Sequence, residues 1–543
     1  MKLTYNKIIL VTLYIVTLSL LAFWGVGHIQ KSVNSDVFYL TQSAEHLLDG
    51  DNMVDSYYDT NPPLSIILQV PAAFMAKYIG IPVYYAISIQ TIFFVILSFF
   101  LVFKSLIYYQ KISWLTYDEI HLIMAVFIVT NTLMVGVEFG QKDQYIAIFL
   151  FPFVLLQLLI IKDVYVSVFL KWFTLIISSF FIILKPYYII VPVVMWAYGL
   201  YKHRSISRAF KSPDMWVLGV ISLYYVAIIY VFFSDYVTEI LPDAITLYAS
   251  VNYQGAMIKS VYYLFIIVAA FIASILLFPE KQTILLFLFS MSVLSLIPFI
   301  IQAKGANYHN IPARLFFMCG FFLLFERLLS VFFSRINMKQ YSYLGVLLAI
   351  PLLAYWSVSY FVPHLSRMSH DEYKKSKLVD IIKSCKTNNS AFVVDSRSYI
   401  ISLVPLYAGK MNASRFSALW FLPPILQMKK NVDDGNITVW DSDTLKDKIR
   451  YYSDLVAQDI SRYRPGVILV SPKSFNFYSN FEFVEFFSEN SDAFLNIWKE
   501  YALVDSATID RNSYDAYKNA YDRFETYNIY LHRECLGVNI PVE

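Results

Sequence analysis

The sequence contains few cysteines and few charged residues for its length. Its 543 residues include three cysteines, which excludes a disulfide-rich scaffold, and no CxxC pair or zinc ligand set occurs. Charged residues make up 15% of the chain, well below the roughly one quarter found in ordinary soluble domains. A net charge of +3 without a basic and aromatic pattern excludes a nucleic-acid-binding class. A glycine-rich phosphate loop is also missing, so no nucleotide site is predicted.

Apolar residues are abundant and are collected in long runs. The chain is 58% hydrophobic, with a mean hydropathy of +0.53. Because a membrane span needs roughly 20 apolar residues, the runs predict a polytopic α-helical membrane protein with a soluble part attached. About eleven spans are predicted, at 8–27, 82–103, 119–137, 144–161, 166–184, 186–201, 215–233, 261–278, 283–302, 311–333 and 342–362.

Charge decides the orientation of these spans. The first run follows Lys2 and Lys7 without a clear cleavage site, which predicts an uncleaved span with a cytoplasmic N-terminus. The segment 63–79 is short and contains Pro71, so we interpret it as an interfacial helix. With eleven spans, more Lys and Arg lie on the cytoplasmic side, as the positive-inside rule requires. The chain is then a bacterial inner-membrane protein whose C-terminal part is periplasmic.

From about residue 366 the chain becomes polar and the long apolar runs end, which predicts two domains, 1–365 and 366–543. Strand-like segments at 391–395, 466–472 and 527–534, with an amphipathic helix at 443–463, indicate a small periplasmic α/β domain. Cys385 and Cys535 can pair in an oxidising periplasm, or each can remain free. The sequence supplies no geometry that would decide between these alternatives.

The first external loop, 28–81, is long and carries polar residues close to the membrane. Ser35 is expected to cap a helix with Asp36 in its first turn, where the helix dipole favours a carboxylate. Asp49-Gly50-Asp51 is expected to end this helix. Tyr58 follows in the same loop, and either it faces a sugar or it packs in the protein.

The later external turns carry charges of both signs beside apolar segments. Glu138, Lys142 and Asp143 lie between two spans, and Lys185 precedes Pro186, where a helix break is expected. The stretch IIQAKGANYHNIPARLFF adds three further potential cations, Lys304, His309 and Arg314. Charges beside hydrocarbon are costly and usually functional, so we expect these turns to form one cavity with acids on one side and cations on the other.

Such a cavity suits the transfer of a sugar from a polyprenyl phosphate. The lipid tail of such a donor lies in the bilayer, and its phosphate lies at the interface. Cations would hold the phosphate and stabilise the charge that develops as it leaves. A carboxylate would take the proton of the attacking hydroxyl.

The chain resembles the C-type (GT-C) glycosyltransferase superfamily, which includes the lipid A aminoarabinose transferases and the protein O-mannosyltransferases. The resemblance rests on four short features in order along the chain. These are Asp36 with Asp49-Gly50, Pro62-Pro63-Leu64, the FGQKD turn from Phe139 to Asp143, and the KG…YH..P turn from Lys304 to Pro312. Val37 departs from the family, which often has an acid after the first Asp.

The resemblance implies an inverting enzyme with a lipid-phosphate sugar donor and a lipid A, polysaccharide or protein acceptor. Asp36, Asp143 and Glu138 would be the acidic residues of the catalytic site. The resemblance assigns the donor phosphate to Lys185 and Lys304, and their position adds His309, Arg314 and Tyr58 as candidate substrate contacts. No metal and no cofactor are expected.

Other interpretations remain open at this point. Asp36 can simply cap a helix, Glu138 can be a solvated loop acid, and Lys142 can extend to the lipid headgroups. Glu326 and Arg327 lie deeper in a span and are interpreted as structural. A transporter or flippase for a lipid-linked or anionic solute is the alternative function, although no internal repeat is found. A non-catalytic scaffold with the same fold is the third interpretation.

Overall fold

The computed structural model describes residues 2–248, 254–278, 283–302, 306–335, 344–395, 398–436, 438–471, 482–510 and 524–536. The chain divides into two compact units, each assembled from several stretches of sequence. The helical unit contains residues 1–29, 88–228 and 252–365, and the mixed unit contains residues 30–87, 229–251 and 366–543.

Each of the eleven predicted spans coincides with a helix. These helices are α1 (Lys2–Gln30), α6 (Val83–Lys111), α7 (Tyr117–Thr130), α8 (Lys142–Ile161), α9 (Val168–Ile182), α10 (Ile190–His203), α12 (Pro213–Phe232), α14 (Gln254–Leu277), α15 (Thr283–Gln302), α16 (Ile311–Arg335) and α17 (Leu344–Leu365). Among the described residues, eight stretches are long and apolar enough to cross a membrane. Helices α7, α9 and α10 are shorter, so the count of eleven stays a prediction.

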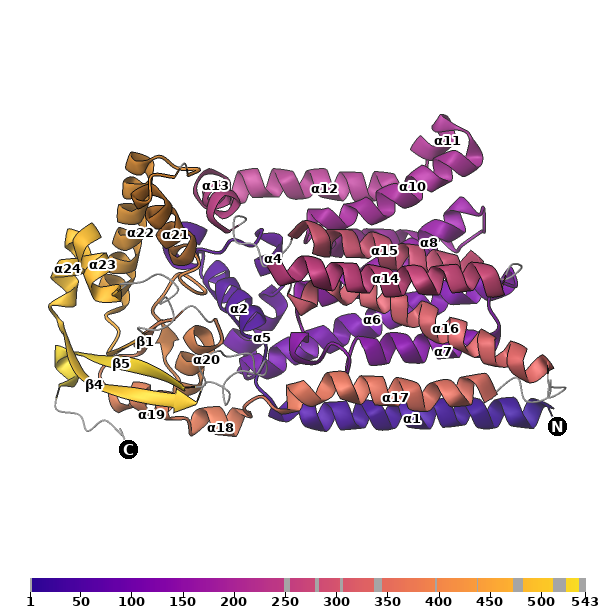
Figure 1. Ribbon diagram of the computed structural model, residues 1–543, viewed down its shortest axis with the longest axis horizontal. Coiled ribbons are helices and arrows are strands. Elements are labelled where there is room, and N and C mark those ends of the chain that lie inside the picture. Colours follow the sequence, from indigo (N-terminus) through magenta and orange to yellow (C-terminus); the bar gives the residue numbers. More distant parts are fainter. Residues whose placement is uncertain are drawn as a thin grey trace. The chain divides into compact units, whose positions relative to one another are not determined.

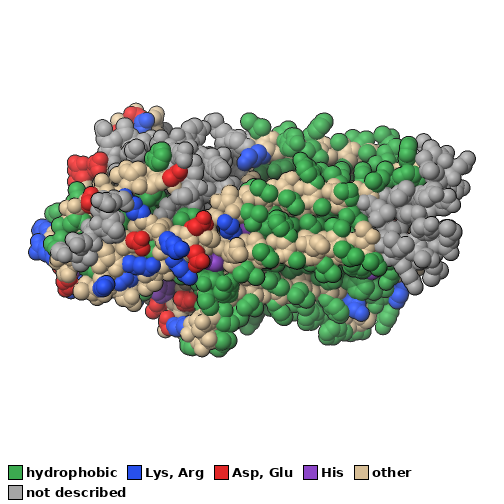
Figure 2. Space-filling view, turned by 90° about the horizontal axis from the view of Figure 1, so that it is seen from below, with side chains coloured by type: hydrophobic (Ala, Val, Ile, Leu, Met, Phe, Trp, Pro, Cys, Tyr) green, Lys and Arg blue, Asp and Glu red, His purple; other side chains and the backbone are tan. Residues whose placement is uncertain are grey.

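Apolar side chains on the surface of the helical unit indicate contact with lipid. Figure 2 shows hydrophobic side chains over most of its visible face, and charged side chains gathered over the mixed unit. Exposed residues on α1, α12 and α14 include Leu18, Leu223 and Phe265. A water-soluble protein rarely exposes so continuous an apolar surface, so the chain is a multi-pass membrane protein.

Helix α8 lies at the centre of the helical unit, where nearly all of its residues are buried. It packs against α9, α10 and α16. Some of the polar side chains around it form hydrogen bonds within the bundle, where no water replaces them. Tyr109 donates to Leu155 O at 2.6 Å, and the hydroxyls of Thr91 and Tyr145 are 2.7 Å apart. Helices α1 and α17 run side by side (Figure 1), with the rings of Phe23 and Phe361 in contact.

A buried ion pair with Glu119 supports the structural interpretation of Arg327. Arg327 Nε donates to Glu119 Oε1 at 2.7 Å, and both side chains are buried. Glu119 also accepts from the backbone N–H of Thr116 and so caps α7. This ion pair connects α7 to α16.

The mixed unit contains a five-stranded sheet in the order β2-β1-β3-β5-β4. Strand β1 (Ser390–Val394) is parallel to β2 (Met411–Asn412) and β3 (Val467–Val470). Strand β5 (Phe524–His532) is antiparallel to β3 and β4 (Tyr501–Asp510). The three predicted strands and the helix α22 (Ser442–Tyr463) are therefore confirmed, whereas β2 and β4 were not predicted.

Most of the remaining helices of the mixed unit come from the first loop and from the C-terminal part, and α13 (Leu241–Asp243) comes from residues 229–251. The first loop supplies α2 (Ser35–Leu48), α3 (Met53–Ser56), α4 (Leu64–Ile67) and α5 (Val70–Ile79). The C-terminal helices besides α22 are α18 (His370–Lys374), α19 (Lys377–Ser384), α20 (Ser398–Ala408), α21 (Leu422–Asp433), α23 (Phe483–Asn490) and α24 (Asp492–Trp498). Helix α2 packs on α5 and α20, and therefore shares a core with the sheet.

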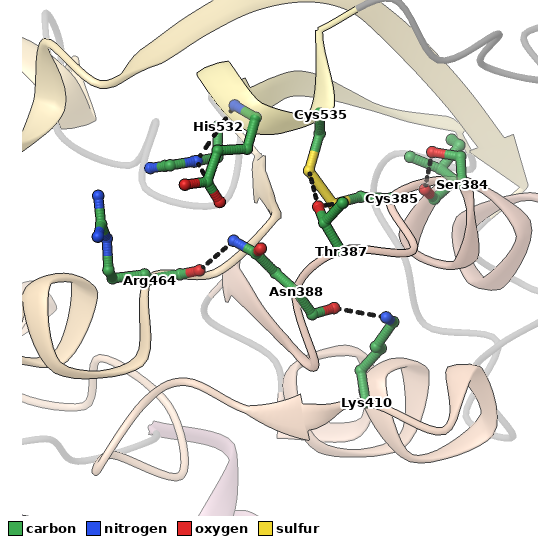
Figure 3. The surroundings of a disulfide bond; sticks show 10 residues. Ser384, Cys385, Thr387, Asn388, Lys410, Arg464, His532 and Cys535 are labelled. Atoms are coloured by element: carbon green, nitrogen blue, oxygen red, sulfur yellow. Dashed lines mark hydrogen bonds and ion pairs between the residues drawn. A yellow bond between two sulfur atoms is a disulfide. The ribbon is translucent and has the colours of Figure 1, made fainter.

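Cys385 and Cys535 form a disulfide (Figure 3), which decides the question that the sequence left open. Their Cα atoms are 5.4 Å apart although the residues are separated by 150 positions. The Thr387 hydroxyl lies 3.4 Å from each sulfur, and Asn388 Nδ2 donates to Arg464 O at 2.7 Å. The bond therefore joins the end of α19 (Lys377–Ser384) to the 3-10 turn η7 (Arg533–Cys535) that follows β5.

Candidate active site

The turn before α8 has a backbone that only glycine adopts easily. Gly136 and Gly140 have φ angles of +56° and +89°. A Cβ added at Gly136 would lie 2.9 Å from the carbonyl oxygen of Tyr360. The Gly140 N–H donates to Gln144 Oε1 at 2.7 Å, and Gln144 donates to Asn131 O at 2.8 Å. These contacts hold the FGQKD turn and place Asp143 in the first turn of α8.

The expected helix break at Lys185-Pro186 is confirmed. Helix α9 ends at Ile182, and a 3-10 turn, η2 (Pro186–Ile189), leads into α10. Lys185 is extended, with φ −133° and ψ 103°, because a residue before proline is disfavoured in the helical region. The break frees the Lys185 side chain from a helix surface and directs it into the helical unit, where the residue is buried.

A third break holds His309. The 3-10 turn η5 (Asn307–Asn310) precedes α16, and His309 is buried at its end. Pro312 follows in the first turn of α16, where a proline removes no helical hydrogen bond. The turn before α8, the break at Lys185-Pro186 and the turn η5 thus supply one polar side chain each, namely Asp143, Lys185 and His309.

These three side chains meet in one buried cluster. Lys185 Nζ lies 2.7 Å from Asp143 Oδ2 and 2.9 Å from His309 Nδ1. Lys185 Nζ also lies 3.4 Å from Gln302 Oε1. Asp143 Oδ1 is 3.3 Å from the Tyr188 hydroxyl, which donates to His309 O at 2.9 Å. The structure thus brings together three residues that were predicted for the site.

The contacts assign the protons in this cluster. A lysine ammonium can only donate, so His309 Nδ1 must accept from Lys185. The neutral imidazole of His309 then carries its proton on Nε2. The ammonium and the Nε2–H are two donors held close together, and a phosphate or another oxyanion is a suitable acceptor for both.

Burial is unequal between the two charged partners. The Asp143 side chain is 0% exposed, whereas the Lys185 side chain retains 10% exposure. The lysine side chain is therefore the more accessible of the two partners. Asp143 is fully sealed behind Lys185, Tyr188 and His309, so its position suits a counter-ion that holds the lysine in place.

Glu138 and Lys304 were also predicted for the site. Glu138 is 7% exposed in η1 (Gly136–Glu138), so the interpretation as a solvated loop acid is wrong. Lys304 lies outside the described residues. Lys142 is only partly buried at the start of α8.

Arg314 faces a separate, mainly apolar cavity of about 330 Å³ in the helical unit. Its guanidinium lies 4.9 Å from the centre of the Tyr360 ring. Arg314 Nε is buried and has no hydrogen-bond partner among the described residues. The cavity lies between α14, α15, α16 and α17 and includes Tyr263, Phe317 and Trp356. An apolar cavity with one unpaired cationic group suits an amphipathic anion.

Asp36 and Tyr58 belong to the mixed unit. Asp36 is partly buried in the first turn of α2, whose cap is Asn34 and not Ser35 as expected. The Asn34 side chain accepts from the backbone N–H groups of Asp36 and Val37 because Asn34 is extended and precedes the first helical residue. Asp36 therefore does not cap α2, and its carboxylate is not needed for that purpose.

Tyr58 has a 0% exposed side chain, packed against the rings of Phe416 and Trp420. Its hydroxyl lies 3.5 Å from Asp243 Oδ2, and burial raises the pKa of its phenol. No face of this ring is open to a sugar, so the structure gives Tyr58 a packing role.

Sequence reasoning missed Tyr188 and Gln302. Tyr188 lies three residues after Lys185 in the stretch KPYY. The 3-10 turn η2, which begins at Pro186, places Tyr188 next to Lys185. Gln302 ends α15 just before the KG…YH..P stretch. Their nearness to predicted site residues in the sequence was the available signal.

Fold and site together define a multi-pass membrane protein with a buried charged cluster at its helix breaks. No family model matches the chain, and no curated protein matches it. Among solved structures, the chain is similar to apo ArnT from Cupriavidus metallidurans, with 11% identity and a TM-score of 0.35. The match covers 99% of this chain and 100% of that chain. We infer the function from the cluster of Asp143, Lys185 and His309 and from the cavity at Arg314, and not from this likeness.

Proposed function

We propose that this protein is an inverting glycosyltransferase that moves a sugar from a polyprenyl-phosphate donor to an acceptor outside the cytoplasm. The acceptor class is lipid A, a surface polysaccharide or a protein. The observation that carries the proposal is the cluster of Asp143, Lys185 and His309 at breaks in apolar helices. Ionisable groups retained at such a position mark a substrate site.

Lys185 and His309 would bind the donor phosphate in this proposal. Both side chains present donors, and the ammonium would stabilise the negative charge that grows on the phosphate as it leaves. Asp143 would hold Lys185 in position and keep it protonated. Lys304 would add a second phosphate contact, as its place in the sequence between α15 and η5 suggests.

The cavity at Arg314 would hold part of the donor lipid. Its lining is mainly apolar and aromatic, which suits an isoprenoid chain, and Arg314 Nε lacks a partner among the described residues. Asn310 lines this cavity and directly follows His309. A lipid bound there would therefore continue toward the segment that carries the cluster.

The chemical step is a displacement at the anomeric carbon. An acceptor hydroxyl forms the new C–O bond on the face opposite the phosphate, and the old C–O bond breaks with its electron pair going to the phosphate. Asp36 would accept the hydroxyl proton, since it is partly exposed and is not used to cap α2. Glu138, which is buried in the helical unit, would be a further acidic residue of the catalytic machinery.

The compartment follows from the proposal and from the disulfide. Disulfides persist in oxidising compartments such as the periplasm. The Cys385–Cys535 bond therefore supports a periplasmic mixed unit, and positive-inside charge supports a cytoplasmic N-terminus.

A deletion strain tests the proposal. Cells lacking the gene, cells with the wild-type gene and cells with Lys185→Met are compared by mass spectrometry of envelope lipids, polysaccharides and proteins. One sugar-bearing species should be absent in the deletion strain and in the Lys185→Met strain. An unchanged profile in both strains would contradict the proposal.

The same strains separate transfer from transport. Loss of a transferase leaves the lipid-linked sugar on the outer leaflet, where membrane-impermeant periodate oxidises it in intact cells. Loss of a flippase leaves that lipid on the inner leaflet, where it is protected until the cells are lysed. Protection from periodate would therefore favour the flippase alternative.

A further inference from the structure

The mixed unit contains a pocket of about 510 Å³, formed where the first loop meets the edge of the sheet. Its lining includes residues of α2, α5 and β2. The volume lies within the range of roughly 300–1,000 Å³ that is typical of small-molecule sites. All of the lining residues belong to the mixed unit.

Asn412 supplies a buried acceptor without a partner. It lies in β2, an edge strand, where its backbone pairs with β1. The residue is 8% exposed, and its Oδ1 has no hydrogen-bond partner among the described residues. A buried polar atom in this state is costly, and a ligand that donates a hydrogen bond would satisfy it.

Helix α2 presents two further polar side chains to the pocket. Gln42 and Glu45 are three positions apart and so lie on one face of the helix. Neither side chain forms a hydrogen bond or ion pair with the residues that the structure describes. Burial raises the pKa of Glu45, and the Lys77 charge only partly opposes this effect.

The other charges of the pocket are already paired. Lys77 forms an ion pair with Asp49, and His46 Nδ1 lies 2.8 Å from Asp51 Oδ2. The pocket therefore offers no unpaired cation from the described chain to an anionic ligand. Glu45 would repel such a ligand.

Two buried tyrosines, Tyr39 and Tyr57, support the pocket from behind, with exposed fractions of 5% and 1%. Tyr39 donates its hydroxyl to Arg415 O at 2.6 Å, and Tyr57 donates to Asp51 O at 3.2 Å. Their hydroxyls are thus engaged and their rings are packed in the protein, so the accessible apolar surface of the pocket comes from Ile81, Pro82 and Met411. An apolar ligand would leave Gln42 and Asn412 unsatisfied, whereas a ligand with both hydroxyls and C–H faces matches the whole lining.

We propose that this pocket binds a glycan, with sugar hydroxyls donating to Asn412 Oδ1 and Glu45 and exchanging hydrogen bonds with Gln42. The inference rests on the proposed function in one respect: the bound glycan would be the acceptor of the transferred sugar, or a part of that acceptor. The soluble part of the chain then selects the acceptor, and the membrane-spanning part binds the donor.

A glycan array tests binding without any transfer reaction. The full-length protein, labelled and purified in detergent, is applied to a printed array of bacterial surface glycans. The wild type and the exposed control Gln427→Leu should bind the same glycans. Gln42→Leu and Asn412→Leu should each weaken that binding at least tenfold while their melting temperatures stay close to that of the wild type. The inference would be overturned if the wild type bound no glycan, or if both pocket variants bound glycans as strongly as the wild type.

The array also separates this inference from the proposed function. Lys185→Met should bind glycans like the wild type and lose transfer. If the wild type transfers sugar in cells but binds no glycan, only the pocket inference fails. If it binds glycans but the deletion strain has an unchanged envelope, only the proposed function fails.

Discussion

Lys185 Nζ and Asp143 Oδ2 lie 2.7 Å apart, although the two residues are 42 positions apart in the sequence. The carboxylate is sealed from solvent and the ammonium retains slight exposure. A buried ion pair of this type contributes little net stability compared with apolar residues of the same size. The presence of this ion pair at the helix breaks is better explained by a function for Lys185 than by a contribution to stability.

This pair gives the first prediction. Lys185→Met and Asp143→Asn should each lower the free energy of unfolding by about 3–5 kcal/mol, because each leaves one buried charge unpaired. The double variant should recover most of that stability and still show no sugar transfer. Thermal unfolding in detergent and envelope mass spectrometry measure the two properties.

The Glu119–Arg327 pair is the matched control, since it is also buried in the helical unit. Arg327→Met should lose a similar amount of stability, and Glu119→Gln with Arg327→Met should recover both stability and transfer. Glutamine retains the cap on α7. Recovery of transfer in the Asp143/Lys185 double variant would show that this pair is structural too.

Arg314 gives the second prediction, which concerns donor affinity. Arg314→Leu should raise KM for the polyprenyl-phosphate sugar by about 10- to 100-fold, the effect of losing a hydrogen bond to a charged group. Arg314→Lys should have a smaller effect because it keeps the charge but loses the fork geometry. Membranes assayed over a range of donor concentrations give KM and kcat separately. An unchanged KM in Arg314→Leu would exclude donor contact at this cavity.

The sequence was sufficient for the helices but not for the cluster. Long apolar runs set the eleven helical segments, and Lys185-Pro186 predicts its own break because proline restricts the preceding residue. The sequence made His309 a candidate substrate contact only by its position in a turn, yet His309 contacts a lysine 124 positions away. Such a contact depends on how α9, α15 and α16 pack, and hydropathy carries no information on that packing.

The mixed unit shows the same limit for local patterns. Strand β1 is an apolar run, buried along its whole length, and was predicted. Strand β4 lies at the edge of the sheet with several exposed residues, so its sequence lacks a clear apolar signal. The pocket at Asn412 joins residues from the first loop to residues more than 300 positions later, and no motif links these segments.

The disulfide gives the third prediction. Cys319 is the one free cysteine in the structure, and it is buried. In denaturant without reductant the wild type should take up one alkyl group, and after reduction it should take up three. The Cys319→Ser variant should take up no alkyl group without reductant and two alkyl groups after reduction. Intact-protein mass spectrometry reads these numbers directly, and three alkyl groups without reductant would contradict the bond.

Loss of the disulfide should also destabilise the mixed unit. Cys385→Ala with Cys535→Ala should lower its free energy of unfolding by about 2–5 kcal/mol, since the bond closes a long loop in the unfolded chain. The helical unit contains neither cysteine, so its own unfolding should change little. Limited proteolysis of the two units in detergent compares these effects.

Glu45 gives the last prediction, a dependence of stability on pH. Burial raises the pKa of this carboxyl above its usual value of 4.5 in the folded protein. Its contribution to stability is therefore complete below pH 4.5 and is lost as pH rises through the raised value. Glu45→Gln cannot ionise, so it should be more stable than the wild type at pH 7 to 8 and no more stable near pH 4. Melting temperatures across this range measure the difference, with the exposed Glu485→Gln as the control. A difference that does not change with pH would show that burial of the Glu45 charge is not costly, and would weaken the case for an unpaired acceptor in the glycan pocket.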